Sequence, residues 1–426
     1  MRPPPRAVVA VGAALVLLPA AAAASGFSLR QHGGRGTAQA GALLARADEP
    51  SAVRYDPAAL VSLSGLRLQA GLDFDISDAR WSSTGVAGRD SEHEIQFTPH
   101  IYLGGRPSDT SRWAWGIGVD SPFWSLTEWP ATTAADRSSQ KDKVALLELR
   151  PSVAYAIDER WSVGAALRFV RGDREERVLS TFPAPDGGGT LPLFAEATST
   201  IDGEGWVLAG RFAERRWGGA AVFSSEVELE GDGELAFRPD GFDPAAVPGF
   251  DALYAPRDAR QRFLLPASLA VGAWKAFGER TRIELDIERE RWSSLERTDV
   301  VIRGDGPSPI FARNRDWRDV TAVRLGGEHR FASGWRVAAG LAHEPSPVPD
   351  ASRDFAFPRG DASVLAIGGG YDLGTIAFDF AWSFHDHERA EAPSIGDSPS
   401  STFAADAQAL SVSARWRLGE RAGGDR

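Results

Sequence analysis

The histidines, serines and acids of this sequence offer few spacings that could support catalysis or metal binding. His385 and His387 would share one strand face, but two imidazoles are too few to hold zinc and no third ligand is evident beside them. A nucleophilic serine would need a histidine and an acid, and no serine spacing singles out a partner among the other candidates, His93, His100, His329 and His343. The sequence also has no cysteine, no Gly-x-Ser-x-Gly elbow and no phosphate-binding glycine loop. We therefore expect no enzyme, and no bound metal or cofactor.

A second chemistry open to this sequence is recognition of a carboxylate by arginine. A guanidinium can hold a carboxylate through two parallel hydrogen bonds. Charged residues recur at positions that would face the inside of a closed sheet: Glu148, Arg150, Arg168, Arg211, Glu284, Asp286, Arg324 and Glu328. Most of them are expected to be solvated or paired with one another. Arg353 is our candidate for a ligand carboxylate, with a structural role in its loop as the alternative.

Strands must position these side chains, because apolar and polar residues alternate with a period of two along most of the chain. In the clearest stretch, one face carries Ile376, Phe378, Phe380, Trp382 and Phe384. The pattern recurs in fourteen segments, which we predict as strands: 66–76, 95–103, 113–119, 147–157, 161–169, 206–212, 221–229, 263–271, 283–287, 323–331, 335–341, 364–371, 376–384 and 410–418.

The connections between these strands alternate in length. Tight polar turns alternate with long loops expected near 121–142, 180–196, 231–260, 303–316, 344–360 and 387–403. An even strand number with this asymmetry predicts an all-β membrane protein, a 14-stranded antiparallel barrel of the bacterial outer membrane. Its apolar face would meet lipid and its polar face a wet interior. Tryptophans at strand ends would lie at the headgroup level, with ordinary core packing as the alternative: Trp161, Trp217, Trp292, Trp317 and Trp335.

The composition argues against other classes. Hydrophobic residues make up 43% of the chain, and only the first 24 residues approach the roughly 20 apolar residues that a membrane helix needs. A net charge of −11 disfavours nucleic-acid binding. A soluble sandwich is disfavoured because one predicted strand places charges at successive positions of its second face, at Arg282, Glu284, Asp286 and Glu288.

The two ends of the chain differ from the rest. Residues 1–24 are expected to be a signal peptide, because Arg2 and Arg6 precede a short apolar core that ends in small residues; a membrane anchor is the alternative. Residues 25–64 are rich in glycine and alanine and lack alternation, so we expect a compact segment with short helices, one of them over Ala38 to Arg46. The barrel is expected over 65–418 and a polar tail over 419–426.

Several motifs are shared with one known family. The most specific is Ser346-Pro347-Val348-Pro349, followed by Arg353 and Pro358. The start of the mature chain, Ser25-Gly26-Phe27-Ser28-Leu29, also matches, and Asp56-Pro57-Ala58 stands where the family has Asn-Pro-Ala. The chain thereby resembles the FadL/TodX family of outer-membrane transporters of hydrophobic compounds, most strongly in its last third.

The resemblance implies a barrel plugged by residues 25–64 that passes fatty acids or other hydrophobic compounds inward. Phe27, Leu29 and Arg353 would contribute to an apolar ligand pocket, and the ligand would leave through an opening in the third strand. Gly116 and Gly118 on that strand mark either the opening or room for the plug.

The same resemblance implies a monomer whose further partners are outer-membrane lipid and the barrel assembly machinery, with no nucleic acid. The plug motif, with Asp56 in place of the family's asparagine, would contact the barrel in an altered way. The alternative function is a general pore, or a surface platform whose outer loops carry the activity.

Overall fold

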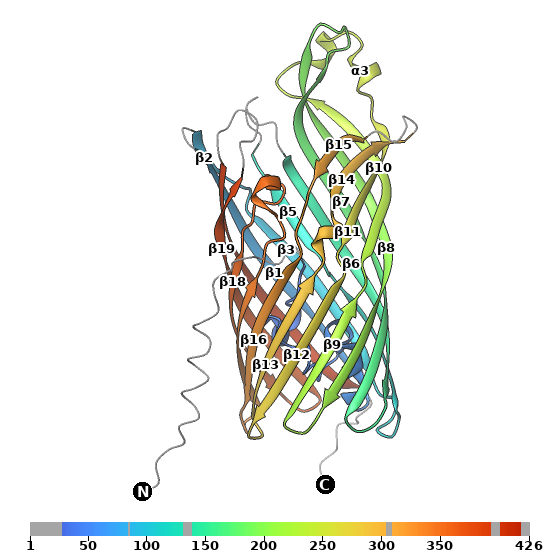
Figure 1. Cartoon of the computed structure of the whole chain (residues 1–426), viewed down its shortest axis with the longest axis vertical. Helices are drawn as coiled ribbons and strands as arrows, with labels where there is room; N and C mark the ends of the chain where they lie inside the picture. The colour runs from blue at the N-terminus through green and yellow to red at the C-terminus, as the bar shows by residue number, and fades with distance from the viewer. Residues whose placement is uncertain (1–27, 84–85, 131–138, 304–308, 393–400, 419–426) are drawn as a thin grey trace.

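The computed structural model describes residues 28–83, 86–130, 139–303, 309–392 and 401–418. These residues form one antiparallel sheet that closes into a tall barrel of tilted strands (Figure 1). The expected signal peptide, the ligand candidate Phe27 and the expected tail lie outside the described residues. In the part of the chain that the structure describes, no helix is long and apolar enough to cross a membrane.

The wall has fourteen strands, as predicted, and six of them consist of two segments each. The segments are β1 (Leu66–Ser83), β2 (Val86–Asp90), β3 (Glu94–Gly105), β4 (Trp113–Asp120), β5 (Trp124–Glu128), β6 (Ser139–Ala156), β7 (Trp161–Pro183), β8 (Thr190–Ala213), β9 (Trp217–Ser224), β10 (Val227–Pro239), β11 (Arg257–Leu265), β12 (Ser268–Phe277), β13 (Thr281–Glu290), β14 (Arg297–Ile302), β15 (Pro309–Asn314), β16 (Val320–Arg330), β17 (Trp335–Glu344), β18 (Ala362–Asp372), β19 (Ile376–Ala392) and β20 (Ser401–Leu418). The barrel closes because β1 pairs with β20 from Leu66 opposite Leu418 to Ser83 opposite Ser401.

Seven short helical pieces accompany the strands in the described ranges. They are α1 (Gly33–Thr37), α2 (Ala52–Tyr55), η2 (Pro57–Ser62), η3 (Pro244–Ala246), α3 (Phe250–Leu253), η4 (Trp292–Ser294) and η5 (Asp350–Ser352). The first three form the plug, which lies inside the barrel in the half nearer the short turns (blue in Figure 1). The predicted helix over Ala38 to Arg46 is wrong: α1 ends at Thr37, because Ala40 (φ 51°) and Gly41 (φ 80°) adopt left-handed backbone conformations that end a helix.

Alternation sorts the strand side chains between lipid and interior. On β13, Ile283, Leu285 and Ile287 point outward and are 39–45% exposed, whereas the intervening carboxylates are buried. The interior is not wet at this level, contrary to the prediction, because the plug fills it. Asp286 accepts a hydrogen bond from the Leu44 backbone N–H at 3.1 Å, and Glu284 accepts one from Ala45 at 2.5 Å.

Two of the predicted long loops are mostly strand. β7 continues to Pro183 and pairs there with Thr190, where β8 begins, so the expected 180–196 loop shrinks to a tight hairpin. β19 and β20 likewise extend through most of 387–403. Backbone pairing continues beyond the membrane, where the apolar alternation that marked the strands is no longer required. The β7–β8 hairpin and α3 form an extension above one side of the barrel (Figure 1).

The tryptophans at strand ends divide into two groups. Trp161, Trp217 and Trp335 are 50–55% exposed at the short-turn end of the wall, as predicted for a headgroup belt. Trp292 and Trp317 are buried inside the barrel, so the belt prediction is wrong for them and core packing holds. Both belong to segments that leave the wall and fold inward between strands, which the sequence periodicity does not indicate.

Candidate functional site

Glycines on the inner face of the wall form the seat of the plug. A Cβ at Gly164 would lie 2.4 Å from the backbone nitrogen of Ala58, and one at Gly340 would lie 2.2 Å from the carbonyl carbon of Gln39. The wall glycines whose added Cβ would meet the plug include Gly104, Gly116, Gly118, Gly164, Gly272, Gly326, Gly340 and Gly368. The absence of side chains at these positions lets the plug approach the wall backbone closely.

Gly340→Ala should displace the plug from this seat. Its Cβ would overlap Gln39, so β17 or the plug must shift, at a cost of about 1–3 kcal/mol for overpacking. We expect faster proteolysis of the plug and higher conductance in planar bilayers. Gly210→Ala on β8 is the matched control, because its added carbon meets nothing within 4 Å. Identical conductance of the two variants would show that the seat does not depend on this contact.

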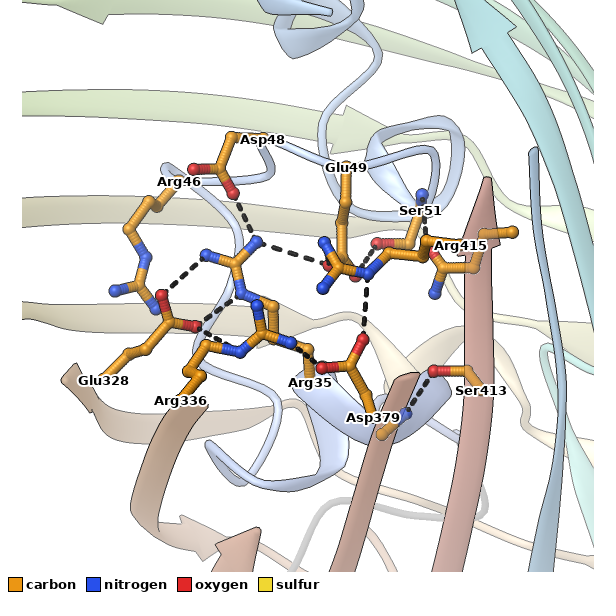
Figure 2. Close-up of polar contacts among 12 residues, drawn as sticks. Arg35, Arg46, Asp48, Glu49, Ser51, Glu328, Arg336, Asp379, Ser413 and Arg415 are labelled. Atoms are coloured by element: carbon orange, nitrogen blue, oxygen red, sulfur yellow. Dashed lines mark hydrogen bonds and ion pairs between the residues drawn. The ribbon is translucent and has the colours of Figure 1, made fainter. Parts of the chain in front are cut away.

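Ion pairs also hold the plug to the wall, at β16 and β20 (Figure 2). Arg35 of α1 donates to Glu328 of β16 at 2.6 Å and also contacts Asp48 and Glu49. Glu49 in turn lies 3.3 Å from Arg415 of β20. Burial acts to lower the pKa of Arg35, but the surrounding carboxylates overcome this and hold its pKa well above the ordinary value. The plug is therefore fixed by buried, mutually neutralised charges, and removing one partner would leave another charge unpaired.

The plug motif Asp56-Pro57-Ala58 begins η2 and touches two wall strands. Asp56 accepts a hydrogen bond from the Ala58 N–H at 2.9 Å, and its other oxygen lies 3.6 Å from Arg211 of β8. Ser162 of β7 donates to the Ala58 carbonyl at 3.0 Å. Burial raises the pKa of Asp56 to about 6, although Arg211 acts in the opposite direction.

This shift predicts that Asp56→Asn stabilises the plug at neutral pH. A carboxyl whose folded pKa exceeds its unfolded value near 3.8 contributes stability that is complete below about pH 4 and is lost as the pH rises through 6. Asparagine keeps the capping oxygen without the charge. We expect the variant to exceed the wild type at pH 7.5 by up to about 3 kcal/mol, and the difference to vanish near pH 4. Thermal unfolding in detergent across this range measures it. Asp186→Asn, an exposed cap of Gly188, is the control; a pH-independent difference would contradict the assignment.

The wall is interrupted where β4 gives way to β5. β6 runs past both, with Asp120 opposite Glu148 and Trp124 opposite Ala145, so residues 121–123 of one strand face only two residues of the other. Such a bulge bends the strand. The bent chain meets the start of the plug: Phe123 forms a bridge with Ser28, and the Leu29 N–H donates to the Pro122 carbonyl at 3.1 Å.

The neighbouring strand loses its partner at the same level. β3 pairs with β4 only from Ile101 to Gly105. Within the described residues, its stretch from Glu94 to His100 forms no ladder with β5. Pro99, which has no N–H to donate, lies in this stretch, as is typical of a strand edge. One bond, from the Glu92 N–H to the Glu128 carbonyl at 2.8 Å, joins the two sides above it. The hydrogen-bonded wall therefore has a gap beside the bulge.

An apolar cluster fills the interior behind this gap. Its buried members are Phe123, Val144, Leu146, Val170, Ile201, Val227, Leu229, Phe263, Leu265, Trp292, Leu295, Trp317, Val320, Val348, Ala356 and Phe357. Aromatic rings run through it from Phe123 to Trp292 (centroids 5.9 Å apart), on to Trp317 (5.2 Å) and then to Phe357 (5.1 Å). Val348 of the Ser-Pro-Val-Pro motif belongs to the cluster, which we call the apolar interior.

A small polar cavity of about 30 Å³ adjoins the apolar interior at the bulge. Pro122, Phe123 and Leu265 line one side of it. Its cationic lining consists of Arg30, Arg54, Arg150 and Arg168. This volume accepts a water molecule or the head of a small anion, not a whole ligand.

The arginines of this cavity carry more positive charge than the acids beside them. Glu290, which also lines the cavity, pairs with Arg30 at 3.0 Å. Glu148 is shared by Arg150, at 2.5 Å, and Arg168, at 2.9 Å. Arg54 is buried and donates to the Leu29 carbonyl at 2.8 Å. Across the described ranges, no carboxylate lies within ion-pair distance of Arg54. The cavity thus offers an unneutralised guanidinium at the end of an apolar interior, which suits an amphipathic anion.

The ligand residues expected from the sequence lie in different places. Leu29 lies beside the cavity through its bonds to Pro122 and Arg54. Arg353 instead braces its own loop, donating to the carbonyls of Arg359 at 2.6 Å and Val348 at 2.8 Å. Gly116 and Gly118 lie in the regularly paired part of β4, and their missing side chains make room for Val53 of the plug.

Sequence reasoning expected an opening in the third strand, but it missed Pro99 and Arg54. Pro99 inside an alternating strand was a usable signal, because proline within a strand indicates an edge or a bulge. Arg54 gave no signal, because it lies in a segment without periodicity and acquires its position only when the plug packs into the wall.

A plugged fourteen-stranded barrel with an apolar interior and a gap in its wall defines an outer-membrane transporter of hydrophobic compounds. The comparison with protein families agrees: residues 15–417 match the family described as outer membrane protein transport protein (OMPP1/FadL/TodX), and the chain belongs to it. The long-chain fatty acid transport protein of Escherichia coli strain K12 is 22% identical over 405 residues, covering 85% of this chain and 87% of that protein.

Two solved structures share the fold. A FadL homologue from Pseudomonas aeruginosa superimposes with a TM-score of 0.82 at 17% identity, covering 92% of this chain and all of that one. The toluene transporter TodX of Pseudomonas putida gives a TM-score of 0.70 at 17% identity, with the same coverage. At this level of identity, the likeness to solved structures establishes the architecture alone. The match to the family confirms the expected family and the outer-membrane location.

Proposed function

We propose that this protein is a passive channel for long-chain fatty acids, or similar amphipathic acids with a long apolar chain, and that the ligand leaves sideways through the wall. The observation that carries the proposal is the meeting of three features at one place. The apolar interior, the cavity with Arg54 and the bulge at residues 121–123 all share Phe123 or its neighbours.

The order of events follows from the chemistry of the ligand. An acyl chain entering the apolar interior gains about 0.8 kcal/mol for each CH₂ removed from water, while its carboxylate reaches Arg54 and the neighbouring guanidiniums. From there the gap between β3 and β5 leads to the lipid-facing side without a passage through the ion pairs of the plug. No energy source is needed, because the ligand moves down its concentration gradient.

Capture would occur in the extension above the barrel. Phe182, Phe237, Phe250 and Tyr254 pack there as a cluster of rings outside the membrane wall. Such a surface suits a dilute apolar ligand. The apolar interior is closed in this structure, so side chains such as Phe123 must move for an acyl chain to enter. The bulge is one of the places where the regular pairing of the wall is interrupted.

Uptake by whole cells tests the proposal. Cells that carry the protein should accumulate a radiolabelled long-chain fatty acid faster than cells without it, at equal external concentration and with the barrel inserted to equal amounts. Toluene in the same assay tests the aromatic-hydrocarbon class. Equal fatty acid uptake with and without the protein would end the proposal.

Conductance separates this function from a general pore or a surface platform. The packed plug and apolar interior predict low conductance of the intact protein in planar bilayers, and deletion of residues 25–64 should raise it. Large, steady conductance of the intact chain would favour a pore. We propose further that the protein acts as a monomer, inserted among outer-membrane lipids by the barrel assembly machinery.

A further inference from the structure

Three side chains that can bind a metal meet where the plug touches the wall. His32 lies just before α1, Asp73 is on β1 and His100 is on β3. All three are buried, with exposed fractions of 3% or less. Nδ1 of His100 lies 3.0 Å from Oδ2 of Asp73, and Nδ1 of His32 lies 3.5 Å from the same oxygen. The two histidines therefore share one carboxylate oxygen from different sides.

Neighbouring groups bind the other carboxylate oxygen of Asp73, so Oδ2 remains available to the two histidines. The other oxygen of Asp73 accepts hydrogen bonds from the Gly33 N–H at 3.3 Å and from the Ser411 hydroxyl. The carboxylate is thus oriented by groups outside the cluster and presents Oδ2 alone. Tyr55 fixes the backbone of His32, accepting from its N–H at 3.1 Å and donating to its carbonyl oxygen, 3.2 Å away. His100 is set by its place in the β1–β3 ladder, opposite Gly71.

Most ring nitrogens of the two histidines lack a hydrogen-bond partner in the described part of the chain. Among the described residues, neither ring nitrogen of His32 has a hydrogen-bond partner, and Nε2 of His100 has none. Buried polar groups are almost always partnered, so a fully buried imidazole with two idle nitrogens calls for an explanation. His100 ends the unpaired stretch of β3 beside the bulge. None of the three side chains lines the polar cavity with Arg54, so the proposed transport route does not use them.

We propose that His32, Asp73 and His100 bind one first-row divalent cation of the zinc class, which joins the plug to the wall. Two imidazole nitrogens and one carboxylate oxygen are the ligand types that Zn²⁺ takes, at about 2.0–2.2 Å. Tetrahedral geometry at that radius separates ligand atoms by roughly 3.4 Å, close to the 3.0 and 3.5 Å between the histidine nitrogens and Asp73. A fourth position remains for water or a neighbouring oxygen.

A cation bound at this site would link the plug to the wall. His32 is the only one of the three ligands in the plug, whereas Asp73 and His100 belong to adjacent wall strands. A bound cation would replace a long imidazole–carboxylate contact by coordinate bonds between plug and wall. Removing it should leave the barrel folded and release the first turn of the plug.

The experiment measures binding of Zn²⁺ alone to the full mature chain in detergent, after treatment with a chelator. We expect one Zn²⁺ per chain by elemental analysis after dialysis, and a higher unfolding temperature when Zn²⁺ is restored. His32→Gln and His100→Gln should each weaken Zn²⁺ binding by at least about 10- to 100-fold, because even substitution of the residues that orient metal ligands causes a loss of this size. His93→Gln is the matched control, because His93 also contacts an aspartate, Asp78 at 2.5 Å, but is exposed.

Each outcome decides the question. Loss of binding in both cluster variants with retention in His93→Gln supports the site, provided that the altered gel mobility of a folded barrel is preserved. Should a variant fail to fold, Co²⁺ added to the wild type must give the absorption bands of a four-coordinate nitrogen and oxygen site. No stoichiometric binding by the wild type, or equal binding by all variants, would overturn the proposal. Fatty acid uptake does not enter any of these readouts.

Discussion

Deleting Pro122 should seal the wall and reduce fatty acid uptake to the level of cells without the protein. Residues 121–123 face only two residues of β6, so removing one restores equal numbers on the two strands. Asp120 faces inward and Trp124 outward, and the shortened segment would place Ser121 outward and Phe123 inward in regular alternation. β4 and β5 then become one strand that can pair with β3 over the stretch from Glu94 to His100.

The control for this deletion is Pro122→Ala. It retains the extra residue and the carbonyl that accepts the Leu29 N–H, so the bulge should persist and uptake should stay near the wild-type rate. Hydrogen exchange of β3 supplies an independent readout, because the backbone N–H groups between Glu94 and His100 that face the gap should become more protected only in the deletion variant. Unchanged uptake in a deletion variant with a protected β3 would show that ligands do not leave through this part of the wall.

The strand count was readable from sequence because membrane and lumen impose opposite demands on alternate residues. The stretch from Ile376 to Phe384 shows this most clearly, and it is indeed part of β19. Where a strand extends beyond the membrane, its outer face no longer has to be apolar, and the alternation that predicts the strand is lost. The hairpin around Pro183 and Thr190 continues as strand outside the membrane without apolar alternation. For the carboxylates of β13, the sequence predicted the inward direction correctly but wrongly predicted contact with water. Periodicity does not reveal that the plug fills the lumen.

The candidate site was less accessible to sequence reasoning because it is assembled from segments far apart in the chain. Gly116 and Gly118 stood out as missing side chains, yet what occupies their space is Val53, which only the packed plug supplies. His32 had no visible partner, since Asp73 and His100 lie on strands whose register sets them side by side only after pairing. Proline was the better guide to the gap, because its missing N–H restricts it wherever the chain folds.

Arg54→Gln should weaken binding of a long-chain fatty acid while leaving binding of the alcohol of equal chain length unchanged. Arg54 lines the polar cavity, is buried, and makes a single hydrogen bond, to the Leu29 carbonyl, in the part of the chain that the structure describes. A hydrogen bond to a charged group contributes about 1.5–3 kcal/mol, which corresponds to roughly 10- to 100-fold in affinity. Arg150 and Arg168 already share Glu148, so they replace Arg54 incompletely.

Binding isotherms of the acid and the alcohol in detergent measure this difference. Arg262→Gln is the matched variant, because it removes the same charge from an exposed guanidinium that pairs with Glu230 at 3.0 Å. We expect it to bind both ligands as the wild type does. Equal weakening of acid and alcohol by Arg54→Gln would mean that Arg54 acts by holding Leu29 at the bulge rather than by meeting the carboxylate. The ratio between the two ligands thus separates a charge that recognises the ligand from one that shapes the wall.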